Sequence, residues 1–254
     1  MSMLPTQPVE YNLDSMSLGV MPKEKKVICV LSGGMDSVTL LHKLVDDGKQ
    51  VKAISFNYGQ IHVKELEMAA WQCEKLGIEH KIIDVTFLKD LLPSTLTGVG
   101  NVPYGHYESD TMKQTVVPFR NTILSSLALG YASGLGYNEI ALGVHAGDHA
   151  IYPDCRPEFI QALQRVADLG DYNRIKIYTP YLYVTKIEII AEGKRLGVDY
   201  SKTWTSYSSG DEPDYKTSSS VERSLGFIRN GIADPLYTPE QWQIAKEYAL
   251  AQKL

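Results

Sequence analysis

Residues that could do chemistry are densest between Leu31 and Ser37, which read Leu-Ser-Gly-Gly-Met-Asp-Ser. Two adjacent glycines let the backbone approach an anion closely, and the hydroxyls of Ser32 and Ser37 can add hydrogen-bond donors. If a helix begins at this point, its free N–H groups and the positive end of its dipole face the same spot. Several converging donors suit a pyrophosphate better than a single carboxylate, so we expect a phosphate-binding loop. No lysine follows the glycines, and the segment is therefore neither a Walker loop nor G-x-G-x-x-G.

The flanking residues predict the elements that must position this loop. The apolar run 27–31 is typical of a buried parallel strand, and apolar residues at helical spacing follow it. Asp36 and Ser37 are residue types that begin helices well. Further strands are expected at 51–57, 80–85 and 139–143, and further helices at 62–76, from Pro118, at 156–169 and at 185–196, with Gly77 and Gly197 as helix ends. This alternation predicts an α/β fold, a doubly wound parallel sheet covered by helices on both faces.

Polar side chains follow the predicted strands, where a ligand of an open α/β sheet binds. Tyr58 and Gln60 follow the second strand, Arg120 and Asn121 stand near the start of a helix, and a polar loop follows the fourth strand. The long stretch 88–114 has no clear periodicity, which is typical of a lid, a binding segment, a disordered segment or an ordered surface excursion without function. Four interpretations of that stretch therefore stay open.

Composition limits the function classes. The 254 residues carry a net charge of −5, so direct nucleic-acid binding is not expected. Three scattered cysteines argue against a disulfide framework and for a reducing compartment, by default the cytoplasm. No apolar stretch reaches the roughly 18 residues of a membrane span. We expect a polar leader at 1–25, in which Met16 or Met21 could be the true start, an ATP-binding α/β domain at 26–200 and a C-terminal appendage of helices and loops at 201–254.

The segment Ser-Gly-Gly-x-Asp-Ser resembles the PP-loop of the ATP pyrophosphatases, enzymes with an adenine-nucleotide α-hydrolase-like fold that adenylate a substrate and release pyrophosphate. Together with F-N-Y-G-Q-x-H at 56–62, V-P-x-R-N at 117–121 and Y-P-D-C-R-P-E-F at 152–159, it resembles the 7-cyano-7-deazaguanine synthase (QueC) family. T-W-T-S-Y at 203–207, V-E-R at 221–223 and D-P-L-Y at 234–237 extend the resemblance. It implies a ligase of queuosine biosynthesis that uses ATP to convert 7-carboxy-7-deazaguanine, with ammonia, to the amide and then the nitrile.

The resemblance also implies roles for individual residues. Asp36 would work beside Mg²⁺, and Arg120 and Lys186 would contact phosphate or carboxylate, as the three catalytic residues. Asp148 and Asp154 would accept hydrogen bonds from the guanine-like N–H edge. The ATP-binding set is Leu31, Ser32, Gly33, Gly34, Met35, Asp36, Ser37, Val38 and Thr39. The substrate-binding set is Tyr58, Gln60, Asn121, Asp148, Asp154 and Arg156. A homodimer is expected, with a small deazaguanine as the ligand.

One departure from the family is large. Where the family has four zinc-binding cysteines, this chain has Ser206, Asp214, Thr217 and Ser220, and such a set cannot replace thiolates, so no zinc is expected. The loss is compatible with a zinc-free synthase or with a paralogue that joins the deazaguanine to a protein amino terminus in anti-phage defence. A non-catalytic ATP-binding sensor or scaffold and a sulfur-transferring enzyme using Cys155 are further alternatives. The final product, the amine donor and the oligomeric state stay open.

Overall fold

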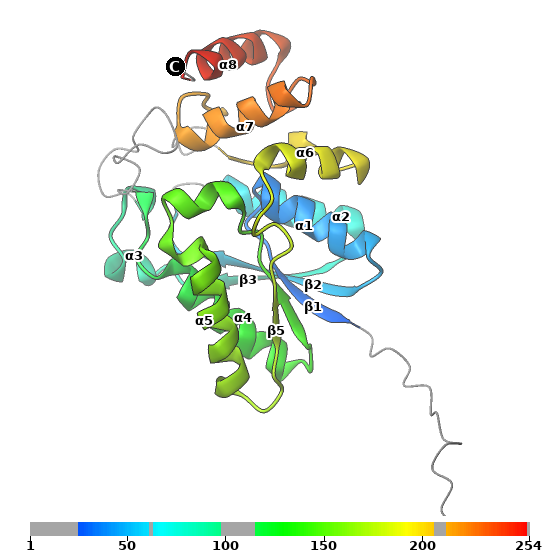
Figure 1. Cartoon of the computed structure of the whole chain (residues 1–254), viewed down its shortest axis with the longest axis vertical. Helices are drawn as coiled ribbons and strands as arrows, with labels where there is room; N and C mark the ends of the chain where they lie inside the picture. The colour runs from blue at the N-terminus through cyan, green and yellow to red at the C-terminus, as the bar shows by residue number, and fades with distance from the viewer. Residues whose placement is uncertain (1–24, 61–62, 98–114, 206–211, 253–254) are drawn as a thin grey trace, which may run out of the picture.

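A computed structural model describes residues 25–60, 63–97, 115–205 and 212–252. Within them, one parallel sheet has the strand order β3-β2-β1-β4-β5 (Figure 1). The strands are β1 Lys26–Val30, β2 Gln50–Asn57, β3 Glu79–Asp84, β4 Glu139–Ala141 and β5 Lys176–Tyr178. The order reverses between β1 and β4, which makes the carboxyl end of β1 the point where this fold binds ligands. The predicted α/β fold with a parallel sheet is confirmed.

Helices cover both faces of this sheet, as the alternating sequence predicted (Figure 1). Because β1 pairs with β2 on one side and β4 on the other, its residues Val27, Ile28 and Cys29 are fully buried, which explains its unbroken apolar run. Val27 and Cys29 pack with α1, α2 and α6, whereas Ile28 packs with α4 and α5. The helices are α1 Met35–Asp46, α2 Lys64–Leu76, α3 Leu88–Leu91, α4 Arg120–Gly134, α5 Pro157–Gly170, α6 Lys186–Arg195, α7 Ser218–Arg229 and α8 Pro239–Ala251.

Several local predictions need correction. Helix α4 begins at Arg120 rather than at Pro118, because Phe119 adopts a left-handed conformation with φ of 54° and interrupts the chain between them. Strand β5 was not predicted, since three residues are too few to show a period. The stretch 88–114 contains α3, and its residues 98–114 lie outside the described part, as do 1–24 of the predicted leader. Gly77 and Gly197 have φ of 66° and 71° at the ends of α2 and α6, which confirms their predicted roles.

The appendage packs on one end of the α/β domain, where α6, α7 and α8 lie in succession (Figure 1). A cluster of Met35, Ile190, Tyr200 and Phe227 joins it to α1 and α6. The Tyr200 hydroxyl also hydrogen-bonds Thr39 Oγ1 at 2.8 Å. The contacts of Phe227 with Tyr200 and with the Met35 cluster cross the expected boundary at residue 200 and bring the appendage to the helix that follows the phosphate loop. In the parts of the chain that the structure describes, no helix combines the length and apolar character that crossing a membrane requires.

Candidate active site

The phosphate loop, Leu31 to Ser37, lies between the end of β1 and the start of α1. Its hydroxyls hold it in shape: the Ser32 N–H donates to Ser37 Oγ at 3.2 Å, and Ser37 Oγ donates to the Gly34 carbonyl at 3.1 Å. Gly33 has φ of 93°, and a Cβ there would lie 1.9 Å from the backbone oxygen of Glu65. Only glycine fits this position, because α2 approaches the loop so closely. Gly34 caps α1 without a side-chain hydrogen bond.

The loop opens on a cavity of about 250 Å³ at the carboxyl ends of the strands. The phosphate-loop end of its lining includes Ser32, Gly34, Asp36 and Ser37, and the apolar part includes Phe56 and the leucines at 66, 96 and 124. The appendage contributes one wall, formed by Trp204, Thr205, Ser219 and Glu222. A pocket with a phosphate-binding end and an apolar end suits a ligand that joins a charged group to a flat ring.

Asp36 supplies one of the carboxylates that line the cavity. Its Oδ2 accepts a hydrogen bond from Lys186 Nζ at 2.7 Å, whereas its Oδ1 is buried without a hydrogen-bond partner among the described residues. Burial raises the pKa of this carboxyl, but the charges of Lys186 and His145 outweigh burial and hold the pKa below its usual range. Asp36 is therefore ionised at neutral pH, and its unpartnered oxygen is suited to bind a cation.

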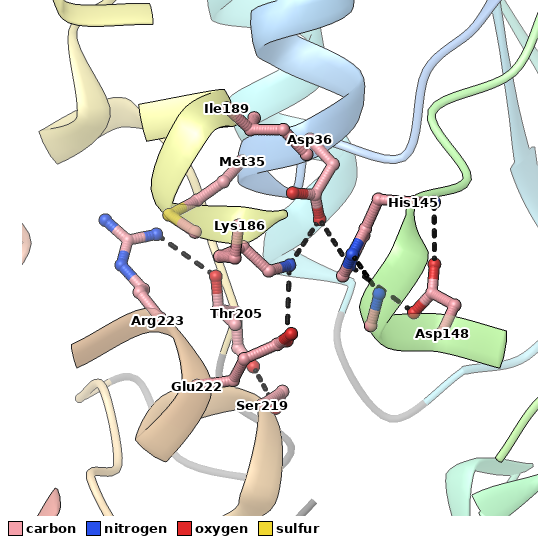
Figure 2. A network of polar contacts seen from close by, with 12 residues as sticks. Met35, Asp36, His145, Asp148, Lys186, Ile189, Thr205, Ser219, Glu222 and Arg223 are labelled. Atoms are coloured by element: carbon pink, nitrogen blue, oxygen red, sulfur yellow. Dashed lines mark hydrogen bonds and ion pairs between the residues drawn. The ribbon is translucent and has the colours of Figure 1, made fainter. Parts of the chain in front are cut away.

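Lys186, the first residue of α6, lies between two carboxylates (Figure 2). Its Nζ is 2.7 Å from Asp36 Oδ2 and 3.4 Å from Glu222 Oε2. Burial lowers the pKa of the Lys186 ammonium, but Asp36 and Glu222 outweigh burial and raise the pKa above its usual value. The capping box of Thr185 and Glu188 fixes the start of the helix and so the direction of the lysine. A permanent cation therefore faces the cavity beside the phosphate loop.

His145 lies between Asp36 and Asp148 (Figure 2). Its Nδ1 accepts a hydrogen bond from the Gly147 N–H at 3.1 Å, so in the neutral ring Nε2 carries the proton. Nε2 is 3.5 Å from Asp148 Oδ1 and 3.9 Å from Asp36 Oδ2. The Asp148 Oδ2 in turn accepts from the His145 N–H at 3.3 Å. The loop after β4 thus holds the Nε2–H group of His145 near the carboxylates of Asp148 and Asp36.

Elsewhere in the cavity lining, Arg120 Nη1 donates to the Tyr58 hydroxyl at 3.4 Å. The Gln60 side chain is buried and stabilises the turn at the end of β2, because it accepts a hydrogen bond from the Tyr58 N–H and donates one to the Phe56 carbonyl. Glu65 also lines the cavity, and burial raises its pKa to about 8, although the charge of Arg120 acts in the opposite direction. Most Glu65 side chains therefore carry a proton at pH 7.

Not every predicted site residue reaches the cavity. Asp154 Oδ2 accepts the Asn121 N–H at 3.0 Å at the start of α4, and Arg156 Nε donates to the His149 carbonyl at 2.8 Å. Neither side chain lines the cavity, so their substrate roles stay predictions without a contact. Val38 and Thr39 lie inside α1, where Thr39 Oγ1 donates to the Met35 carbonyl. Cys155 lines the cavity, but burial raises its thiol pKa far above neutral, which makes it a poor nucleophile.

Three of the four positions that the sequence analysis matched to zinc-binding cysteines form a hydrogen-bonded cluster in the appendage. Asp214 Oδ1 accepts from the N–H groups of Lys216 and Thr217, and Thr217 Oγ1 lies 3.0 Å from Ser220 Oγ. Ser206 lies outside the described residues. Within the described residues no group of three or more His, Cys, Asp or Glu side chains could hold a metal ion. Hydroxyls that bond one another are a poor donor set for zinc.

Sequence reasoning missed three residues of the site. Glu222 belonged to a matched motif, V-E-R, but received no role, and His145 was noted only as part of a polar loop. Glu65 stands at the start of an amphipathic helix, where a solvent-exposed glutamate is ordinary. The motif could have pointed to Glu222. For Glu65 the deciding fact is the close packing of α2 on the phosphate loop, which the spacing of residues does not reveal.

Comparison with known proteins gives consistent results. The family model described as "Queuosine biosynthesis protein QueC" matches residues 26–231. A protein of Hahella chejuensis named 7-cyano-7-deazaguanine synthase is 51% identical over 212 residues, covering 83% of this chain and 92% of that protein. A Colwellia psychrerythraea protein named 7-cyano-7-deazaguanine synthase 1 is 47% identical over 213 residues, with 84% and 98% covered. Among solved structures, an NMN synthetase from Francisella tularensis is 16% identical with a TM-score of 0.47, covering 92% of this chain and 88% of that one.

Proposed function

The chain belongs to the QueC family, and on that premise we propose that it adenylates the carboxylate of 7-carboxy-7-deazaguanine and couples it to ammonia. ATP would be cleaved to AMP and pyrophosphate, and the amide would then be activated again and dehydrated to the nitrile. The observation that carries this proposal is the phosphate loop at the end of β1, with Lys186 and an unpartnered oxygen of Asp36 beside it. The names of the relatives, which state the product 7-cyano-7-deazaguanine, support a deazaguanine as the small-molecule ligand.

Magnesium fits the donor set at Asp36. Mg²⁺ usually binds one or two carboxylates together with substrate phosphates and water, and Asp36 Oδ1 is a buried carboxylate oxygen that has no partner among the described residues. The ion would neutralise charge on the departing pyrophosphate when bound. The N–H groups and serine hydroxyls of the phosphate loop would hold the pyrophosphate, and Lys186 would add a permanent positive charge.

Adenylation forms a bond between a carboxylate oxygen of the substrate and the α-phosphorus and breaks the bond to pyrophosphate. Arg120 lines the cavity and would orient that carboxylate by a planar, two-pronged contact. In the second step the amine nitrogen attacks the acyl carbon, AMP leaves, and the nitrogen loses a proton. Glu65 is within the same cavity and could accept this proton when it is ionised, because its pKa of about 8 lies near the working pH.

The deazaguanine ring would lie against the apolar part of the lining, among Tyr58, Phe56 and the neighbouring leucines. Asp148 lines the cavity and is a candidate acceptor for the guanine-like N–H edge, beside the backbone of the loop after β4. Asn121 is also in the lining, so both stay in the proposed substrate site. The homodimer and the protein amine acceptor stay predictions, because no contact among the described residues bears on either of them.

Structural zinc is not part of this proposal. The hydroxyl groups of Thr217 and Ser220 together with Asp214 do not fit zinc, and hydrogen bonds within this cluster support the start of α7 instead. The buried ion pair of Arg223 with Asp234, both 0% exposed, further fixes this part of the chain. We therefore derive no step through zinc.

Substrate-dependent exchange of labelled pyrophosphate into ATP tests the adenylation step. We expect exchange only when ATP, Mg²⁺ and 7-carboxy-7-deazaguanine are all present, because the acyl-adenylate must form reversibly before an amine arrives. A sensor or scaffold that binds ATP without chemistry would show nucleotide binding but no exchange under the same conditions.

A further inference from the structure

The Lys186 ammonium is shared by carboxylates from two distant segments (Figure 2). Asp36 belongs to α1 beside the phosphate loop, and Glu222 belongs to α7 in the appendage. The side chains are only 10%, 23% and 20% exposed for Lys186, Asp36 and Glu222, so water screens these charges weakly. The appendage therefore acts electrostatically on the residue pair at the centre of the proposed site.

Glu222 is held in place by its neighbours. The adjacent Arg223 is completely buried and donates to Asp234 Oδ1 at 2.8 Å and to Thr203 Oγ1 at 2.8 Å, which fixes α7 at this turn. On the other side, a Cβ at Gly147 would lie 2.5 Å from Glu222 Oε1 and 2.8 Å from His145 Cε1. The glutamate thus fits into a narrow space between α6 and the loop after β4, where a glycine makes room for it.

Two cations would need Asp36 at the same time. Lys186 bonds its Oδ2, and a divalent ion held at Oδ1 would repel the ammonium. With Asp36 as its sole carboxylate, Lys186 would compete with the ion for both oxygens. A second carboxylate on the far side of the ammonium relieves this competition, because it keeps Lys186 in place without using Asp36.

We propose that Glu222 is a positioning residue that holds the Lys186 ammonium beside the phosphate loop and so leaves an oxygen of Asp36 available to a divalent cation. This inference rests on the proposed binding of pyrophosphate at that loop. It assigns to the appendage a direct part in the site, through one carboxylate of the V-E-R motif, in addition to forming a wall.

The test is the binding of inorganic pyrophosphate, measured by titration calorimetry with and without MgCl₂ for the full chain and its variants. The ratio of the two dissociation constants reports how strongly the metal and the anion assist one another. In Glu222→Gln we expect this ratio to fall by about fivefold or more, at the lower end of typical couplings between two ligands, while binding without Mg²⁺ is unchanged or tighter. Complexes of Mg²⁺ with pyrophosphate in solution affect all variants equally.

Glu222→Asp keeps the charge and should restore part of the ratio. Glu247→Gln in α8, an exposed glutamate that accepts from Gln243, is the matched control and should resemble the wild type. An equal loss of binding with and without Mg²⁺ in Glu222→Gln would reduce the residue to a structural role, and two dissociation constants that both match the wild type would remove any role; either result overturns the inference. A wild-type chain that shows the coupling but forms no AMP would contradict the proposed function and leave this inference standing.

Discussion

Lys186 Nζ lies 2.7 Å from Asp36 Oδ2, although 150 positions separate the two residues in the chain. The contact joins the first turn of α1 to the first turn of α6 and places opposite charges beside the phosphate loop. Because Lys186 and His145 lower the pKa of Asp36 against the effect of burial, the pair stays charged at neutral pH. A phosphate and its metal ion would therefore meet a preorganised cation and anion.

Replacement of Asp36 by Asn keeps the shape of the side chain and removes its charge. We expect AMP formation to fall by roughly 100-fold or more, the size seen when one preorganised electrostatic contact is lost. Asp46→Asn is the matched control in the same helix, because its partner Arg195 is exposed and surface pairs contribute little. AMP release quantified by chromatography gives both values. Near-wild-type activity of Asp36→Asn would remove Asp36 from the mechanism.

Gly33→Ala should disrupt the phosphate loop. A Cβ would lie 1.9 Å from the Glu65 carbonyl oxygen, at a position whose φ of 93° already disfavours alanine. Gly48→Ala separates the two effects, since Gly48 also has a positive φ, of 68°, but its Cβ would meet nothing within 4 Å. We expect about 1 kcal/mol of destabilisation at Gly48 and clearly more at Gly33, measured by urea unfolding. Equal losses of unfolding free energy for the two variants would mean that α2 shifts away from the added methyl group at Gly33 without destabilising the fold.

The purified chain should contain far less than one zinc per molecule, because Asp214, Thr217 and Ser220 bond one another at positions where the resemblance led us to expect zinc-binding cysteines. Elemental analysis of protein purified without added metal measures the zinc content directly. Stoichiometric zinc would show that other ligands hold it.

Asp214→Asn should lower the melting temperature, because the Asp214 carboxylate accepts hydrogen bonds from two backbone N–H groups. Glu212→Gln, at an exposed neighbouring residue, should leave the melting temperature unchanged.

Glu65→Gln should change how stability depends on pH. The pKa of Glu65 is raised to about 8 in the fold, so between the unfolded value near 4.5 and pH 8 the folded state binds more protons than the unfolded state. The wild type therefore loses stability as pH rises through this window, by up to about 5 kcal/mol for the full shift of the Glu65 pKa, and the glutamine variant lacks this loss. Denaturant titrations from pH 5 to 9 give the slope. Glu67→Gln, at an exposed residue of the same helix, is the control. Parallel curves of stability against pH for Glu65→Gln and the wild type would mean that the fold does not raise the pKa of Glu65.

Much of the fold follows from local patterns. The buried run of β1, the glycine turn and the apolar face of α1 predict the strand, loop and helix that the structure contains, because each depends on neighbours in sequence. Strand β5 escapes such reasoning, since its three residues are recognised only by pairing with β4. The start of α4 was misplaced because the left-handed Phe119 has no signature in residue type.

The site was predictable where a motif coincides with a strand end, and unpredictable where it depends on long-range packing. Asp36 and Arg120 belong to matched motifs, Lys186 stands near the start of a predicted helix, and all three line the cavity. Asp154 instead accepts a hydrogen bond from the backbone at the start of α4, a use of the carboxylate that motif matching does not distinguish from ligand binding. Glu222 reaches Lys186 only because α7 packs on α6, which no local pattern of residues reveals.

Mass spectrometry of the products from ATP, 7-carboxy-7-deazaguanine and ammonium is the direct test of the proposed reaction. We expect AMP and pyrophosphate together with masses of the amide and then the nitrile, and loss of all products in Asp36→Asn. Omitting ammonium should leave adenylation without amide, and a protein amino terminus added in its place should yield no conjugate, because ammonia is the proposed donor. ADP with inorganic phosphate, or ATP binding with no change in the deazaguanine mass, would show that the chain does not catalyse this reaction.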